Sequence, residues 1–164
     1  MDPDALRDLV TRARAETTLP LFTKLSPATQ DLVRTATIAL EAGSTGLTLV
    51  NTMPGLLVDV ETRKPELGFG SGGMSGGALL PIGVLATWKV YRATGAPIIG
   101  AGGIASATDA IQYLIAGAKA FAIGTAVLRD PRLPARLLRD LASWCEVRGI
   151  NSVAELSGTL EWPS

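Results

Sequence analysis

"PIIGAGGI" (residues 97–104) is an apolar run that ends in glycines, and "AFAIGTAV" (residues 120–127) repeats this pattern. Short apolar runs bounded by glycine are typical of buried strands. Between them, "SATDAIQYLIAG" (106–117) has the apolar spacing of a helix and begins with Ser106, a favourable N-cap residue. The order strand, helix, strand predicts a parallel sheet in which both glycine-rich ends lie at the same edge.

The rest of the chain continues this alternation. Helices are expected over residues 2–17, 26–43, 77–95 and 130–149, and strands over 19–25 and 45–51. Ser26 is the expected N-cap of the second helix, with Pro27 at its first position, and Pro81 falls in the first turns of the third. Residues 52–76, with six glycines and two prolines, are expected to be irregular. The result is four βα units after an extra helix, with strands buried on both faces.

An internal repeat narrows the fold. "EAGSTGLTLV" (41–50) matches "IAGAKAFAIG" (115–124) in outline, and "TTLPLF" (17–22) matches "TGAPII" (94–99). In each match the two segments are separated by two βα units. This spacing favours half of a TIM (β/α)8 barrel over a doubly wound sheet. A full barrel usually needs about 250 residues, whereas this chain has 164. The prediction is therefore an α/β domain over residues 1–164 with parallel strands, equivalent to half a barrel.

Composition excludes several kinds of function. Lys plus Arg number 15 and Asp plus Glu number 15, so neither nucleic acid nor an anionic membrane surface is an expected partner. The chain has no histidine and a single cysteine, which excludes a His-based triad, and no metal site or disulfide is expected. The acidic N-terminal segment is no signal peptide and no apolar run is long enough to span a bilayer, so a cytoplasmic location is expected.

Chemistry in parallel α/β folds gathers beyond the carboxyl ends of the strands. Here those ends carry one cation, two polar side chains and two glycine-rich turns, namely Lys24, Asn51, Thr52, Gly102, Gly103, Gly124 and Thr125. Glycine lets backbone amides approach an anion, and Gly124-Thr125 is expected to open a short helical turn that favours phosphate. The alternative, that these glycines only permit close packing, stays open. The pattern lacks the spacing of a Walker or dinucleotide-binding loop.

Three side chains each allow a second interpretation. Lys24 either extends into solvent from the surface or directs its charge into the mouth of the fold. Asn51 either binds a ligand or satisfies the local backbone as a turn former. Cys145, within the last predicted helix, is interpreted as a packed residue without a catalytic role.

Taken together, "FTKLSP", "GLTLVNT", "TRKPELGFGSGGMSG", "PIIGAGGI" and "AIGTAV" resemble the C-terminal half of dihydroorotate dehydrogenase. That resemblance, from about residue 3 to residue 160, implies an FMN-dependent (β/α)8 barrel that oxidises (S)-dihydroorotate to orotate in pyrimidine biosynthesis. Within the family the chain is most similar to class 1, type 1B catalytic subunits. These imply a partner subunit with FAD and an iron–sulfur cluster, with NAD as electron acceptor.

The resemblance also implies roles for individual residues. Lys24 matches the lysine that contacts the flavin, and Val50 lies in the strand end that contacts FMN. Asn51 and Thr52 match the pair that binds dihydroorotate or orotate, and Gly76 matches a glycine under the flavin. The remaining matches form the FMN phosphate site: Gly102, Gly103, Gly124 and Thr125.

The family's catalytic base is a cysteine in an Asn-x-x-Cys-Pro-Asn motif well before the lysine strand, and no such motif is present here. No catalytic residue is therefore assigned. The chain is expected to be a fragment or a split gene product, inactive alone, whose partner is a missing N-terminal half or a second copy. The alternatives are the flavin domain of a dihydropyrimidine dehydrogenase, a dihydrouridine synthase and a non-catalytic phosphate-binding half-barrel. The balanced charge argues against the tRNA enzyme.

Overall fold

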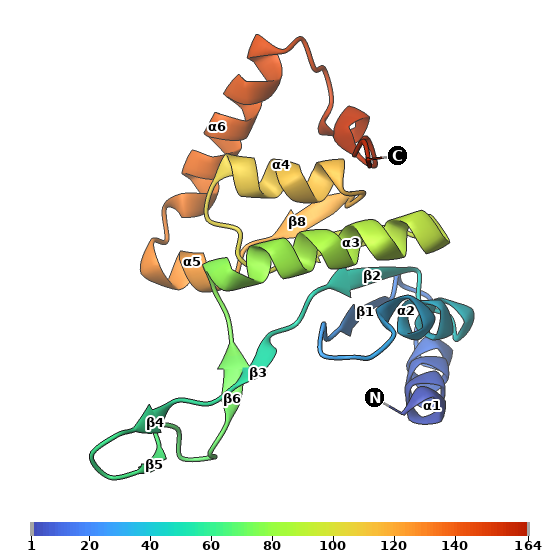
Figure 1. Ribbon diagram of the computed structural model, residues 1–164. Coiled ribbons are helices and arrows are strands. Elements are labelled where there is room, and N and C mark those ends of the chain that lie inside the picture. Colours follow the sequence, from blue (N-terminus) through green and yellow to red (C-terminus); the bar gives the residue numbers. More distant parts are fainter. Residues whose placement is uncertain (1, 164) are drawn as a thin grey trace.

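A single parallel sheet of four strands organises the protein (Figure 1). The structure is a computed structural model that describes residues 2–163. The strand order is β1–β2–β7–β8, with the strands at Phe22–Leu25, Gly46–Leu49, Ile98–Ala101 and Ala120–Ala122. The parallel sheet predicted from the sequence is confirmed. Within the described residues the sheet is open, with β1 and β8 as its edges, which is consistent with half a barrel.

The helices lie close to where the sequence predicts them. Their bounds are α1 (Pro3–Ala15), α2 (Leu32–Glu41), α3 (Leu80–Thr94), α4 (Ala107–Ile115), α5 (Thr125–Arg129) and α6 (Leu133–Val147), with short 3-10 turns η1 (Gly77–Leu79) and η2 (Val153–Leu156). Pro81 falls in the first turn of α3, and the Ser106 side chain caps α4 by accepting from the Asp109 amide at 3.2 Å. Within residues 2–163, no helix has both the length and the apolar character needed to cross a membrane.

The start of α2 differs from the prediction. The helix begins at Leu32 rather than near Pro27, and its N-cap is Asp31, whose Oδ1 accepts from the Arg34 amide at 2.9 Å. Ser26 instead closes a separate turn, in which its hydroxyl accepts from the Ala28 amide at 3.2 Å. Serine and aspartate favour both N-caps and such turns. The local pattern therefore does not decide between the two starts.

Residues 53–74 form an arm of two antiparallel ribbons rather than the irregular loop that was predicted. Strand β3 (Met53–Gly55) pairs with β6 (Gly72–Met74), and β4 (Val58–Asp59) pairs with β5 (Lys64–Pro65). The arm projects away from the sheet (Figure 1). At its tip, hydrogen bonds from Thr62 and from the Glu61 amide lower the pKa of Asp59. Several large apolar side chains of the arm are exposed, including Leu57, Val60 and Phe69.

Among the described residues, helices cover one face of the sheet and leave the other open. The side chains of Leu25, Leu47, Leu49 and Ile98 are fully buried against α2 and α3. The opposite face carries residues that alternate with these, and there Lys24, Ala120 and Ala122 are exposed. The prediction that all four strands are buried on both faces is therefore wrong for β1 and β8, because no described helix covers this second face.

The two candidate caps of α2 can be separated by measurement. We expect Asp31→Ala to lower the free energy of unfolding by about 1 kcal/mol, because it removes the N-cap acceptor. Ser26→Ala, which removes only a turn contact, should have a clearly smaller effect. Urea unfolding followed by circular dichroism measures both. An equal or larger loss for Ser26→Ala would contradict the assignment of the cap.

Candidate functional site

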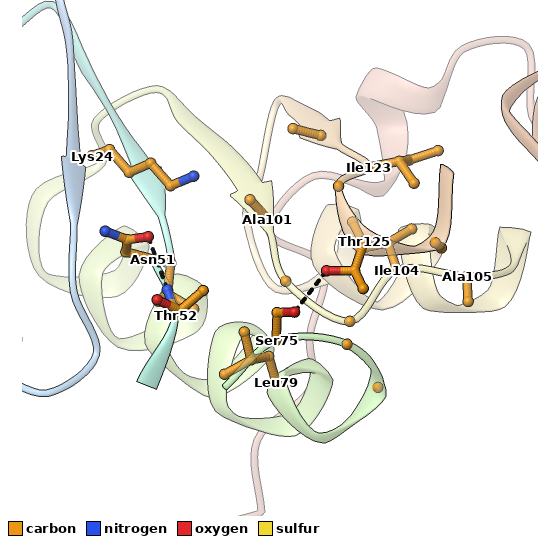
Figure 2. A pocket seen from close by; sticks show the side chains of 18 residues that line it. Lys24, Asn51, Thr52, Ser75, Leu79, Ala101, Ile104, Ala105, Ile123 and Thr125 are labelled. Carbon is orange, nitrogen blue, oxygen red and sulfur yellow. Dashed lines mark hydrogen bonds between the residues drawn. The ribbon is translucent and has the colours of Figure 1, made fainter. Parts of the chain in front are cut away.

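An open pocket of about 320 Å³ lies at the carboxyl edge of the sheet (Figure 2). It is formed where β1, β2, β7 and β8 end and where the segment after β6 crosses beside them. The pocket brings together every site residue predicted from the sequence: Lys24, Val50, Asn51, Thr52, Gly76, Gly102, Gly103, Gly124 and Thr125. Their proximity is a finding of the structure, whereas the individual ligand roles remain predictions.

One end of the pocket carries the cation and the polar side chains. Lys24 extends from β1 beside Asn51 and Thr52 (Figure 2), and its side chain is exposed. The backbone amide of Asn51 donates to the Leu25 carbonyl at 2.8 Å. The side-chain Oδ1 of Asn51 accepts from the backbone amide of Thr52 at 2.9 Å. Asn51 therefore does stabilise its own turn, as one interpretation predicted. Its side-chain NH₂ group is left to donate to a ligand.

The other end is built from backbone that only glycine readily adopts. Gly102 and Gly103 have φ values of +118° and +76°. A Cβ added at Gly103 would lie 2.5 Å from the Leu80 nitrogen, so close packing requires this glycine. At Gly76, with φ +88°, and at Gly124, an added Cβ would meet nothing within 4 Å. Packing thus explains Gly103, whereas Gly76 and Gly124 leave open space along the pocket wall.

The amides of the glycine turn remain available to a ligand. The neighbouring amides are already used, since Asp109 accepts from the Ala105 amide at 3.0 Å and Ser106 accepts from that of Asp109. Outside the described helices and strands, the amides of Gly102 and Gly103 donate no backbone hydrogen bond. Helix α5 has the predicted position but only five residues. An anion at this turn would therefore be held by individual amides rather than by a helix dipole.

Sequence reasoning missed two residues that shape the glycine-rich end. Tyr113 of α4 is fully buried, and its hydroxyl donates to the carbonyl oxygens of Gly102 at 2.8 Å and Ala101 at 3.0 Å. Burial strongly raises the pKa of Tyr113, so the hydroxyl keeps its proton and remains a donor. The Tyr113 contacts join residues that lie 11 and 12 positions apart in the sequence, and a helical pattern alone gives no indication of them.

Ser75 is the second residue that sequence reasoning missed. The Thr125 hydroxyl donates to the Ser75 Oγ at 2.9 Å, across the pocket (Figure 2). This contact ties the segment that follows β6 to the turn between β8 and α5. The "SGG" pattern indicated Gly76 but gave no reason to single out the neighbouring hydroxyl.

Cys145 lies outside the pocket. It is buried on α6 in an apolar cluster with Ile111 and Leu141. A general base must reach the proton that it removes, and the position of Cys145 does not meet this requirement.

Comparison with known proteins establishes the family. The family model for dihydroorotate dehydrogenase matches residues 1–144. A dihydroorotate dehydrogenase A (fumarate) of Solibacter usitatus is 43% identical over 161 residues, which are 98% of this chain and 53% of that protein. The catalytic subunits of dihydroorotate dehydrogenase B (NAD(+)) of Geotalea daltonii and Desulforudis audaxviator are 40% and 41% identical; the matches cover 98% and 96% of this chain and 52% and 51% of those proteins. The chain therefore belongs to the dihydroorotate dehydrogenase family, and it spans about half the length of these relatives.

The distinct demands on two pocket glycines can be tested by substitution. Gly103→Ala should lower the free energy of unfolding by about 2 kcal/mol or more, because the new Cβ meets backbone at a positive φ. Gly77→Ala is the matched control, since its Cβ would meet nothing within 4 Å and should change stability by less than about 0.5 kcal/mol. Urea unfolding curves for the two variants decide the point. Equal losses would contradict the packing role of Gly103.

Proposed function

We propose that this chain is the FMN-binding part of a dihydroorotate dehydrogenase that oxidises (S)-dihydroorotate to orotate in pyrimidine biosynthesis. The observation that carries the proposal is the gathering of all nine predicted residues around one pocket, in a chain that belongs to this family. The pocket also suits FMN chemically. Glycine amides lie at one end and a lysine lies at the other.

The residues divide into three tasks. The amides of Gly102, Gly103, Gly124 and Thr125 would hold the phosphate, since backbone N–H groups beside glycine can approach an oxyanion closely. Val50 and Gly76 would lie against the ring system, where an added Cβ at Gly76 would occupy free space. Bound FMN would supply the hydride-accepting chemistry.

Asn51, Thr52 and Lys24 would act on the reacting end. The Asn51 NH₂ group and the Thr52 hydroxyl can fix a pyrimidine ring in one orientation, which brings reacting atoms together without further loss of entropy. The Lys24 ammonium group places positive charge at the same end and favours a ligand on which negative charge develops.

Partners are part of the proposal because the chain spans about half the length of its relatives. We propose that further polypeptide covers the exposed face of the sheet. The remainder of a barrel would also supply the general base, whereas a second copy of this chain would cover the face without supplying one. Two of the three relatives described above are named catalytic subunits of the NAD(+) type. Their names favour an electron-transfer subunit, of the kind that carries FAD and an iron–sulfur cluster, as an additional partner.

Selective binding of FMN over riboflavin tests the cofactor proposal. A phosphate held by several amides makes charge-assisted hydrogen bonds, and we expect at least about tenfold tighter binding of FMN than of riboflavin. Quenching of flavin fluorescence during titration with the purified chain measures both affinities. Gly124→Val, which places a branched side chain in the open space, should abolish the preference. Equal affinities in the unsubstituted chain would refute the phosphate site.

A separate prediction concerns turnover. Saturated with FMN, the purified chain should not oxidise dihydroorotate measurably, because general-base assistance worth about 10²–10⁴ in rate is missing from the pocket. Reduction of dichlorophenolindophenol in the presence of dihydroorotate provides the assay. Sustained turnover that survives Cys145→Ala would show that another group in this chain acts as the base.

A further inference from the structure

Tyr113 controls the direction of two peptide groups at the glycine-rich end of the pocket. Its hydroxyl lies 2.8 Å from the carbonyl oxygen of Gly102 and 3.0 Å from that of Ala101. In a trans peptide the N–H group points away from the C=O group. Holding these two carbonyls toward Tyr113 therefore turns the amides of Gly102 and Gly103 away from it. Both glycines line the pocket.

The surrounding structure is shaped to admit this side chain. A Cβ at Gly83 of α3 would collide with the Tyr113 hydroxyl, and a Cβ at Gly100 of β7 would collide with its ring. Helices α3 and α4 and strand β7 thus hold the Tyr113 phenol under the glycine turn. Burial there raises its pKa, so the hydroxyl keeps its proton and can donate. The Ala101 carbonyl accepts from a second donor, the Val50 amide, at 2.7 Å. The Gly102 carbonyl accepts from the Tyr113 hydroxyl.

We propose that Tyr113 is a positioning residue for phosphate recognition, acting through the peptide groups of Gly102 and Gly103 without touching the ligand. This inference rests on the proposed binding of FMN. It assigns the selectivity for the phosphate group in part to a hydroxyl behind the pocket wall. A residue acting in this way affects ligands with a phosphate and leaves the binding of the ring system alone.

Tyr113→Phe removes the hydroxyl and keeps the ring. We expect its affinity for FMN to fall about tenfold, the effect of misdirecting a charge-assisted hydrogen bond, whereas its affinity for riboflavin stays unchanged. Tyr91→Phe is the matched control, because this substitution also removes one tyrosine hydroxyl and Tyr91 does not line the pocket. Both ligands are titrated by flavin fluorescence on the same preparation, so a change in the fraction of folded protein affects both equally.

The outcomes separate the two proposals. If the unsubstituted chain prefers FMN and Tyr113→Phe retains that full preference, the role of Tyr113 is wrong and the phosphate site stands. Equal loss of both ligands would also overturn it, since that indicates a general structural effect. If the unsubstituted chain shows no preference for FMN, the proposed phosphate site itself fails.

A measurement without ligand keeps the inference testable in every case. In ¹⁵N-labelled protein, Tyr113→Phe should shift the amide resonances of Gly102 and Gly103. The Gly76 amide, on the segment after β6, should stay as it is, and Tyr91→Phe should affect none of the three. Unchanged Gly102 and Gly103 resonances in Tyr113→Phe would overturn the positioning role whether or not FMN binds.

Discussion

The parallel pairing of β2 with β7 is the interaction on which the rest of the structure depends. Leu47 lies opposite Ile98 and Leu49 opposite Gly100, although the whole arm and α3 separate these strands in the chain. This pairing joins β1 and β2 to β7 and β8. Because parallel strands point the same way, it also forces Asn51 and Gly102 to leave the sheet at one edge. The two ends of the pocket exist only because of that register.

The parts of the fold that the sequence predicts are those with a local cause. Apolar runs that end in glycine identify β7 and β8, and Ser106 identifies the start of α4. The predicted start of α2 was wrong because Ser26 and Asp31 are both suitable N-cap residues. Only the folded structure shows that Asp31, and not Ser26, accepts from an amide in the first turn of the helix. The ribbons of the arm were missed because their strands are only two or three residues long.

The candidate site divides in the same way. Its polar and glycine residues were found because each directly follows a strand, which is where parallel folds place their chemistry. Position after a strand does not identify Tyr113. Its importance depends on the close packing of its side chain against Gly83 and Gly100, which lie on two other elements. Ser75 needs the base of the arm to lie near Thr125 before its hydroxyl has a partner. Contacts between residues far apart in the sequence produce no periodic pattern from which they could be predicted.

The exposed face of the sheet sets the electrostatic character of the pocket. Lys24 and the small Ala120 and Ala122 lie on this face, so water reaches the ammonium group from the open side. In water, a charge pair at 4 Å is worth about 1 kcal/mol, against about 4 kcal/mol at the effective dielectric constant near a protein surface. Covering the face would also desolvate Lys24, a cost that a negatively charged or charge-developing ligand offsets. The same covering would therefore strengthen the attraction of Lys24 for such a ligand and penalise a neutral one.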